Sequence, residues 1–111
     1  MSTSAFLLYT TPAGDLEGTS ISRMGGTIPE QVAEKFGKDY DAIVKHIAEG
    51  RKRGGYRLIS DDEPYWDADD EDLIITSIQA GMDADYAWHL LPSGTVELVE
   101  IVPTFRLVSV K

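Results

Sequence analysis

The sequence contains no cysteine, which excludes disulfide bonds, thiolate metal ligands and a cysteine nucleophile. It contains no apolar run that approaches the roughly 18 residues needed to span a membrane. The opening residues 1–5 carry no basic group ahead of an apolar stretch, so a secretory signal is not expected and we predict a cytoplasmic protein. A chain with these absences must fold by burying apolar side chains.

Basic residues are absent from a long internal stretch. No Lys or Arg occurs from Leu58 to Phe105, which spans 48 positions and holds 12 acidic residues. The remainder of the chain has 10 basic and 7 acidic residues, so the charge is distributed unevenly along the sequence. Eight acidic residues fall within residues 61–72, a segment that we call the acidic tract.

The 111 residues are enough for one domain, and we predict a single globular domain over residues 1–111. The apolar pattern predicts an α+β fold with an N-terminal strand, one or two helices over about 28–53, and then an antiparallel meander of four or five strands. One sheet face is expected to carry the helix, whose apolar side follows the spacing Val32, Phe36, Tyr40, Ile43 and Ile47. The predicted strands are residues 5–10, 56–60, 73–78, 86–91, 95–102 and 105–110, and residues 15–26 are expected to form a loop, with at most a short strand over 19–23.

Residues 29–58 also contain a pattern typical of a DNA-binding motif. Ala33, Gly37 and Ile43 have the spacing of a helix-turn-helix, and the run Arg53–Leu58 resembles the strand of a wing. The segment thus resembles winged-helix DNA-binding proteins, and the resemblance implies a regulator that contacts phosphates with its basic residues. The alternative interpretation is an amphipathic helix, interrupted at Gly37, that packs on the sheet.

The acidic tract favours a protein that binds a basic partner. Clustered carboxylates speed encounter with a positively charged surface, and aromatic side chains among them can anchor the contact. We therefore predict an inhibitor of a nuclease or another nucleic-acid-binding protein, of the immunity, antitoxin or phage-encoded nucleic-acid-mimic type, without direct nucleic-acid or membrane binding. The predicted partner-binding residues are Asp61, Asp62, Glu63, Tyr65, Trp66, Asp67, Asp69, Asp70, Glu71 and Asp72.

Two other chemistries deserve comparison with this hypothesis. Asp67, Asp69 and Glu71 alternate as calcium ligands do, but the glycine and the final glutamate of the EF-hand loop are absent, so no metal or other cofactor is expected. If Pro92-Ser93-Gly94 forms a tight turn, His89 faces Glu97 across a hairpin. With Arg106 on the neighbouring strand, this pair could serve acid–base hydrolysis, which is a third function hypothesis beside the preferred non-enzymatic one.

Overall fold

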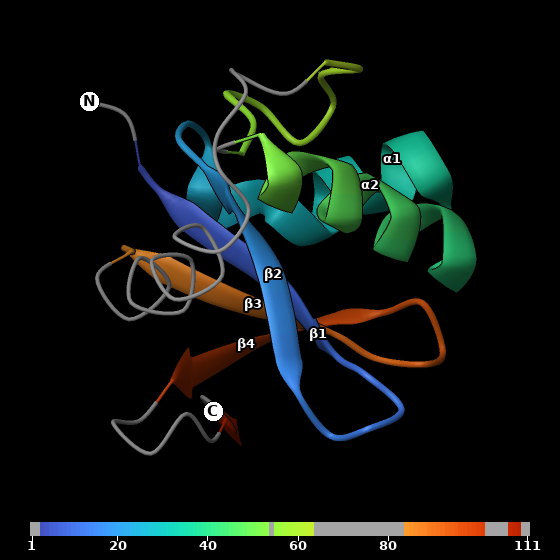
Figure 1. Ribbon diagram of the computed structural model, residues 1–111. Helices are drawn as coiled ribbons and strands as arrows, with labels where there is room; N and C mark the ends of the chain where they lie inside the picture. Colours follow the sequence, from blue (N-terminus) through green and yellow to red (C-terminus); the bar gives the residue numbers. More distant parts are fainter. Residues whose placement is uncertain (1–2, 54, 64–83, 102–106, 110–111) are drawn as a thin grey trace.

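The computed structural model describes residues 3–53, 55–63, 84–101 and 107–109. Two helices lie on one face of a mixed sheet (Figure 1), so the predicted α+β class is confirmed. The described strands have the order β2-β1-β3-β4-β5. The elements are β1 (Ala5–Thr10), β2 (Leu16–Ile21), the 3-10 turn η1 (Gly25–Thr27), α1 (Ile28–Phe36), α2 (Tyr40–Lys52), β3 (Tyr86–Leu90), β4 (Val96–Ile101) and β5 (Leu107–Ser109).

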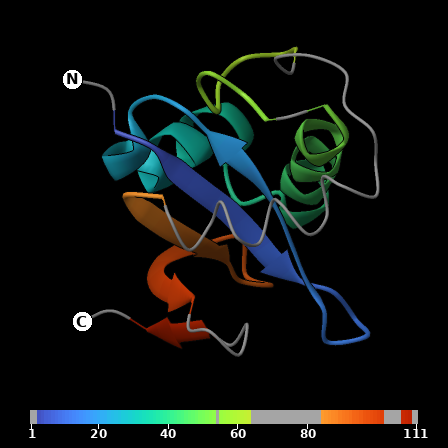
Figure 2. The same ribbon diagram turned by 60° about the vertical axis from the view of Figure 1, so that its left-hand side comes forward.

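The prediction of a purely antiparallel meander is wrong, because β1 pairs with β3 in parallel. The β3–β4 and β4–β5 pairs are antiparallel, as expected. A parallel pair needs a long crossover, and here the connection includes both helices. The N-terminal strand therefore lies inside the sheet, between β2 and β3, rather than at its edge (Figure 2).

The loop expected over residues 15–26 is only partly a loop, because β2 forms an antiparallel hairpin with β1. Gly14 turns the chain with φ 89°, a backbone conformation that suits glycine. Gly18 lies so close to the Phe6 ring that an added Cβ would come within 2.6 Å of it. A glycine, which is uncommon in strands, is therefore the residue that fits at this position of β2.

The glycine interruption at Gly37 separates two helices, as the sequence allows. Asp39 caps α2 by accepting a hydrogen bond from the Ala42 N–H at 3.2 Å. Val32, Ile43 and Ile47 are buried against the sheet as predicted, whereas Phe36 is only half-buried. The helical face therefore forms the main core, together with Leu7 and Leu90 from the sheet.

The predicted strand over residues 56–60 is wrong, because the segment makes only one β-bridge to the described residues, between Tyr56 and Ile21. Tyr56 and Ile59 are both fully buried in the cluster that includes α2, whereas a strand would alternate its faces. The predicted strand over residues 73–78 lies outside the described residues.

The β3–β4 hairpin is confirmed around Pro92-Ser93-Gly94, where Gly94 has φ 86°. Its register places His89 opposite Glu97, as the turn length predicts. Along β1, alternate side chains point to the two sheet faces, so Phe6 and Leu8 lie on the face away from the helices. These two residues form a second buried cluster with Ala87 and Val99.

Candidate functional site

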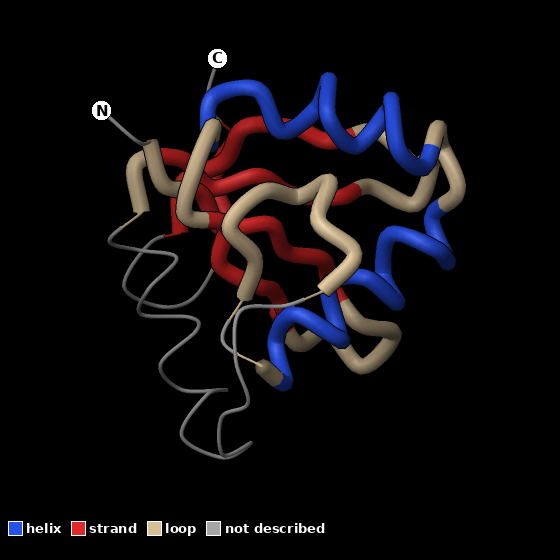
Figure 3. Tube along the Cα trace, turned by 90° about the horizontal axis from the view of Figure 1, so that it is seen from above, coloured by secondary structure: helices blue, strands red, loops and turns tan. Residues whose placement is uncertain are grey.

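Residues 55–63, here called the docked segment, lead into the acidic tract. The two helices diverge as the arms of a V, and the docked segment lies between them (Figure 3). The Tyr56 hydroxyl donates to the His46 carbonyl of α2 at 2.6 Å. His46 Nε2 in turn lies 2.9 Å from the Ile59 carbonyl, so the neutral imidazole donates to the docked segment. These two buried hydrogen bonds attach the docked segment to α2.

The other arm of the V holds the docked segment through Lys35 of α1. The Lys35 ammonium donates to the Ser60 carbonyl at 2.8 Å and to the Asp62 carboxylate at 2.7 Å. The hydrogen bond from Lys35 and its positive charge lower the pKa of Asp62. Asp61 faces inward instead and accepts a hydrogen bond from the Leu58 N–H at 3.1 Å. Both helices therefore hold the docked segment, and α1 also binds Asp62, the second residue of the acidic tract.

The imidazole of His46 lies between two aromatic rings. It stacks on Tyr56 with a centroid distance of 4.1 Å and tilts against Phe36 at 5.0 Å. Burial lowers its pKa, while the hydrogen bond to the Ile59 carbonyl opposes that change. Among charged groups, Lys35 also lowers the pKa, and Glu49 and Asp62 raise it. His46 is therefore neutral at physiological pH, and its protonation opposes the packing around it.

We expect the protein to lose stability as the pH falls below about 6.5. The unfolded chain has the ordinary histidine pKa of 6.5 and binds a proton more readily than folded His46, so the full stability is present above that pH. Each unit of pKa difference corresponds to about 1.4 kcal/mol. Urea unfolding between pH 7.5 and 5 measures this loss.

The matched variants for this experiment are His46→Phe and His89→Asn. Burial also lowers the pKa of His89, so both histidines contribute in the same direction. His46→Phe should remove the larger part of the pH dependence, because His46 is the more buried of the two. A full pH dependence in that variant would refute the role assigned to His46.

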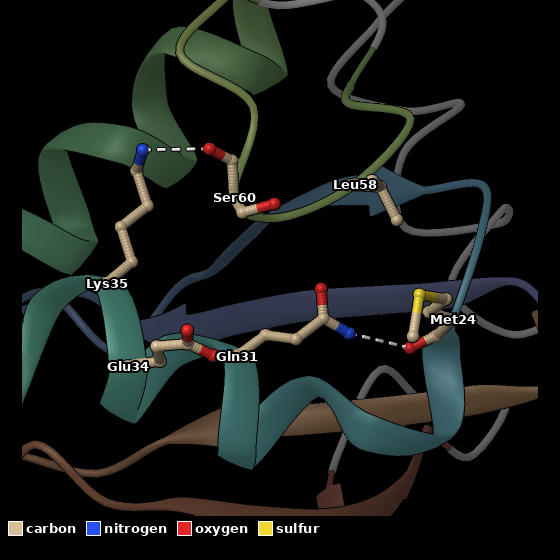
Figure 4. Close-up of a pocket in the computed structure, with 6 residues that line it drawn as sticks. All are labelled: Met24, Gln31, Glu34, Lys35, Leu58 and Ser60. Atoms are coloured by element: carbon tan, nitrogen blue, oxygen red, sulfur yellow. Dashed lines mark hydrogen bonds between the residues drawn. The ribbon is translucent and has the colours of Figure 1, made fainter.

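A groove of about 460 Å³ lies between α1 and the docked segment (Figure 4). Its walls are formed by Met24, Gln31, Glu34, Lys35, Leu58 and Ser60. Met24 is 55% exposed, and among the described residues it is the one large hydrophobic side chain that is exposed. It follows β2 with φ 55°, and its carbonyl accepts a hydrogen bond from the Gln31 side chain at 3.0 Å. An exposed apolar side chain thus lies beside the docked segment.

Sequence reasoning missed the groove. Lys35 and Ser60 are 25 positions apart, and only the docking of residues 55–63 brings them together. Met24, a large apolar residue after Ser22 and Arg23 and before two glycines, is the one local signal that could have indicated it.

The structure places three of the ten predicted partner-binding residues. Asp61 is half-buried, whereas Asp62 and Glu63 are exposed, with the Asp62 side chain 91% exposed. Asp62 and Glu63 also border a second hollow on the side of α2, which they share with Glu49, Lys52 and Arg53. The remaining predicted residues lie outside the described part of the chain: Tyr65, Trp66, Asp67, Asp69, Asp70, Glu71 and Asp72.

The predicted His89–Glu97 pair lies on the sheet face away from the helices. His89 Nδ1 is 3.8 Å from a Glu97 carboxylate oxygen, and His89 Nε2 is 3.1 Å from the Thr10 hydroxyl. Burial lowers the pKa of His89, and the carboxylate of Glu97 opposes that change. Thr10, which the sequence did not single out, thus completes a polar contact across three strands. Arg106 lies outside the described residues.

No group of three or more His, Asp or Glu side chains suited to a metal ion occurs within the described residues. The alternating acids considered for calcium, Asp67, Asp69 and Glu71, lie outside them. In the same described part of the chain, neither helix has the length and apolar character needed to cross a membrane. No protein-family model matches the chain, and no match was found among curated proteins or among solved structures.

Proposed function

We propose that this protein is a non-catalytic binding protein that presents an acidic surface to a basic protein partner. The partner is a nuclease or another nucleic-acid-binding protein, and the protein acts as its inhibitor in the cytoplasm, without a cofactor. An immunity protein, an antitoxin or a phage-encoded nucleic-acid mimic would act in this way. The observation that carries the proposal is the docked segment, which is fixed to both helices, leaves Asp62 and Glu63 exposed, and holds Asp62 against Lys35 at the edge of the groove.

The electrostatics support a basic partner. The chain has a net charge of −9, and its longest stretch without a basic residue begins within the docked segment. A focused negative field raises the rate of encounter with a positively charged surface. The apolar side chains of Met24 and Leu58 line the groove together with Lys35, which binds Asp62, and they supply the apolar contact that a charged rim alone lacks.

The packing of the docked segment supports a preformed surface. Four hydrogen bonds join it to the helices: Lys35 of α1 donates two and His46 of α2 donates one, and Tyr56 of the segment donates one to the His46 carbonyl. A surface that is ordered before binding loses little conformational entropy in the complex. This arrangement suits an inhibitor that must bind tightly.

The alternative is a winged-helix regulator that binds DNA through residues 29–58. In such a protein the second helix enters the major groove. Here one side of α2, with Ile43, Ile47 and Gly50, packs on the sheet, and its outward side carries both signs of charge. Arg51, near the end of α2, lies 3.5 Å from Glu17, which offsets part of its charge. These contacts favour the inhibitor over the regulator.

A gel shift with random-sequence duplex DNA at low salt separates the two functions. Low salt strengthens any contact between basic side chains and phosphates, so it gives the regulator its best chance to bind. We expect no shift, because the net negative charge repels the duplex. A shift that disappears on raising the salt would support the regulator and contradict the proposed inhibitor.

The hydrolase hypothesis retains His89 and Glu97 as an acid–base pair. The confirmed pairing and the Thr10 hydroxyl are compatible with it. The same contacts also serve as an ordinary polar link between β1, β3 and β4, and for that reason the binding function is preferred.

A further inference from the structure

We infer that the groove between α1 and the docked segment binds an arginine side chain of the basic partner. This inference rests on the proposed function, and it adds the chemistry of the contact residue. The groove volume of about 460 Å³ is in the range of small-molecule sites, roughly 300–1,000 Å³. It is therefore large enough to accommodate one long side chain.

The walls of the groove suit the aliphatic part of an arginine. Met24 and Leu58 come from different segments, and both line the groove (Figure 4). The hydrogen bond from the Gln31 side chain to the Met24 carbonyl holds the chain beside the groove. Arginine buries its methylene groups on such apolar surface while its charged end reaches a polar partner.

The charge of the groove selects a cation. Lys35 is the basic residue among those that line it, and its ammonium is already bound by the Ser60 carbonyl and Asp62. Glu34 precedes Lys35 by one position on α1, and no ion pair joins Glu34 to any residue in the described ranges. Of the two charged side chains in this lining, Lys35 is paired with Asp62, and Glu34 has no counterion among the described residues.

Arginine fits this carboxylate better than lysine does. Its planar guanidinium donates two parallel hydrogen bonds to a carboxylate, whereas an ammonium acts as a point charge. Nucleic-acid-binding surfaces are rich in arginine for the same reason, since phosphates are recognised in that way. A groove with apolar walls and one carboxylate without a counterion would compete with nucleic-acid phosphates for such an arginine.

The test is an NMR titration with blocked arginine, Nα-acetyl-arginine N-methylamide, followed on the Met24 and Leu58 methyl groups. Blocked citrulline is the matched probe, because it has the same shape without the charge. We expect blocked arginine to shift both methyl signals. Blocked citrulline should bind at least about tenfold more weakly, because it cannot form the charge-assisted hydrogen bonds.

Two variants of α1 separate the groove from general charge. Glu34→Gln should weaken arginine binding about tenfold or more, whereas Glu30→Gln, an exposed carboxylate on the same helix that does not line the groove, should leave it unchanged. Equal binding of citrulline, or equal effects of the two variants, would overturn the inference. The proposed function would survive that result, because the contribution of the acidic tract to partner association is measured separately.

Discussion

Replacing Tyr56 with alanine is expected to lower the free energy of unfolding by about 3–5 kcal/mol, the usual cost of truncating a buried aromatic side chain. The Tyr56 ring is fully buried, stacks on His46 and lies against Gly50, where an added Cβ would come within 2.3 Å of it. Removing the ring would leave a cavity and also release the docked segment from α2. Urea unfolding at pH 7.5 measures the effect.

Tyr56→Phe is the matched control for that experiment. It keeps the ring and removes the hydrogen bond from the hydroxyl to the His46 carbonyl. The expected cost is about 1 kcal/mol, because the net value of one intramolecular hydrogen bond is of that order. If Tyr56→Ala were as stable as Tyr56→Phe, the ring would not hold the docked segment in place.

Local spacing in the sequence was sufficient to predict the helices and the β3–β4 hairpin. The four-residue interval between Ile43 and Ile47 places both on one side of α2, and Gly94 marks the turn that aligns His89 with Glu97. Both features depend on residues close together in the chain. They could be predicted because helical and hairpin geometry are local.

Contacts between distant segments could not be predicted in this way. The parallel pairing of β1 with β3 joins residues about 80 positions apart, as in the pair of Leu8 and His89. The pattern of residues 56–60 resembles a strand, but the helices offer Tyr56 and Ile59 a common buried site. The groove depends on that same docking, so its residues Met24, Glu34 and Leu58 had no shared signal in the sequence.

Neutralising four aspartates of the acidic tract is expected to slow association with the basic partner tenfold or more. The variant replaces Asp67, Asp69, Asp70 and Asp72 with asparagine. Electrostatic steering acts mainly on the association rate, and it weakens as salt screens the charges. The variant should therefore associate more slowly at low salt and should show a flatter dependence on salt. It should remain folded, because closely spaced carboxylates repel one another.

A matched control removes four negative charges elsewhere on the surface. It consists of Asp15→Asn, Glu30→Gln, Asp41→Asn and Glu100→Gln, all at exposed positions. Both variants have the same net charge, so any difference between them reports the position of the charge rather than its amount. We expect the control to change the association rate by less than about threefold, since distant surface charges are largely screened.

The ratio of the two association rates tests the central claim most directly. The measurement is stopped-flow association with the basic protein that the unaltered chain retains from host lysate at low salt, repeated over a range of salt concentrations. The binding function predicts that the tract variant associates at least about threefold more slowly than the control at low salt, and that the two rates converge at high salt. Equal rates at every salt concentration, or the absence of any retained basic protein, would contradict it.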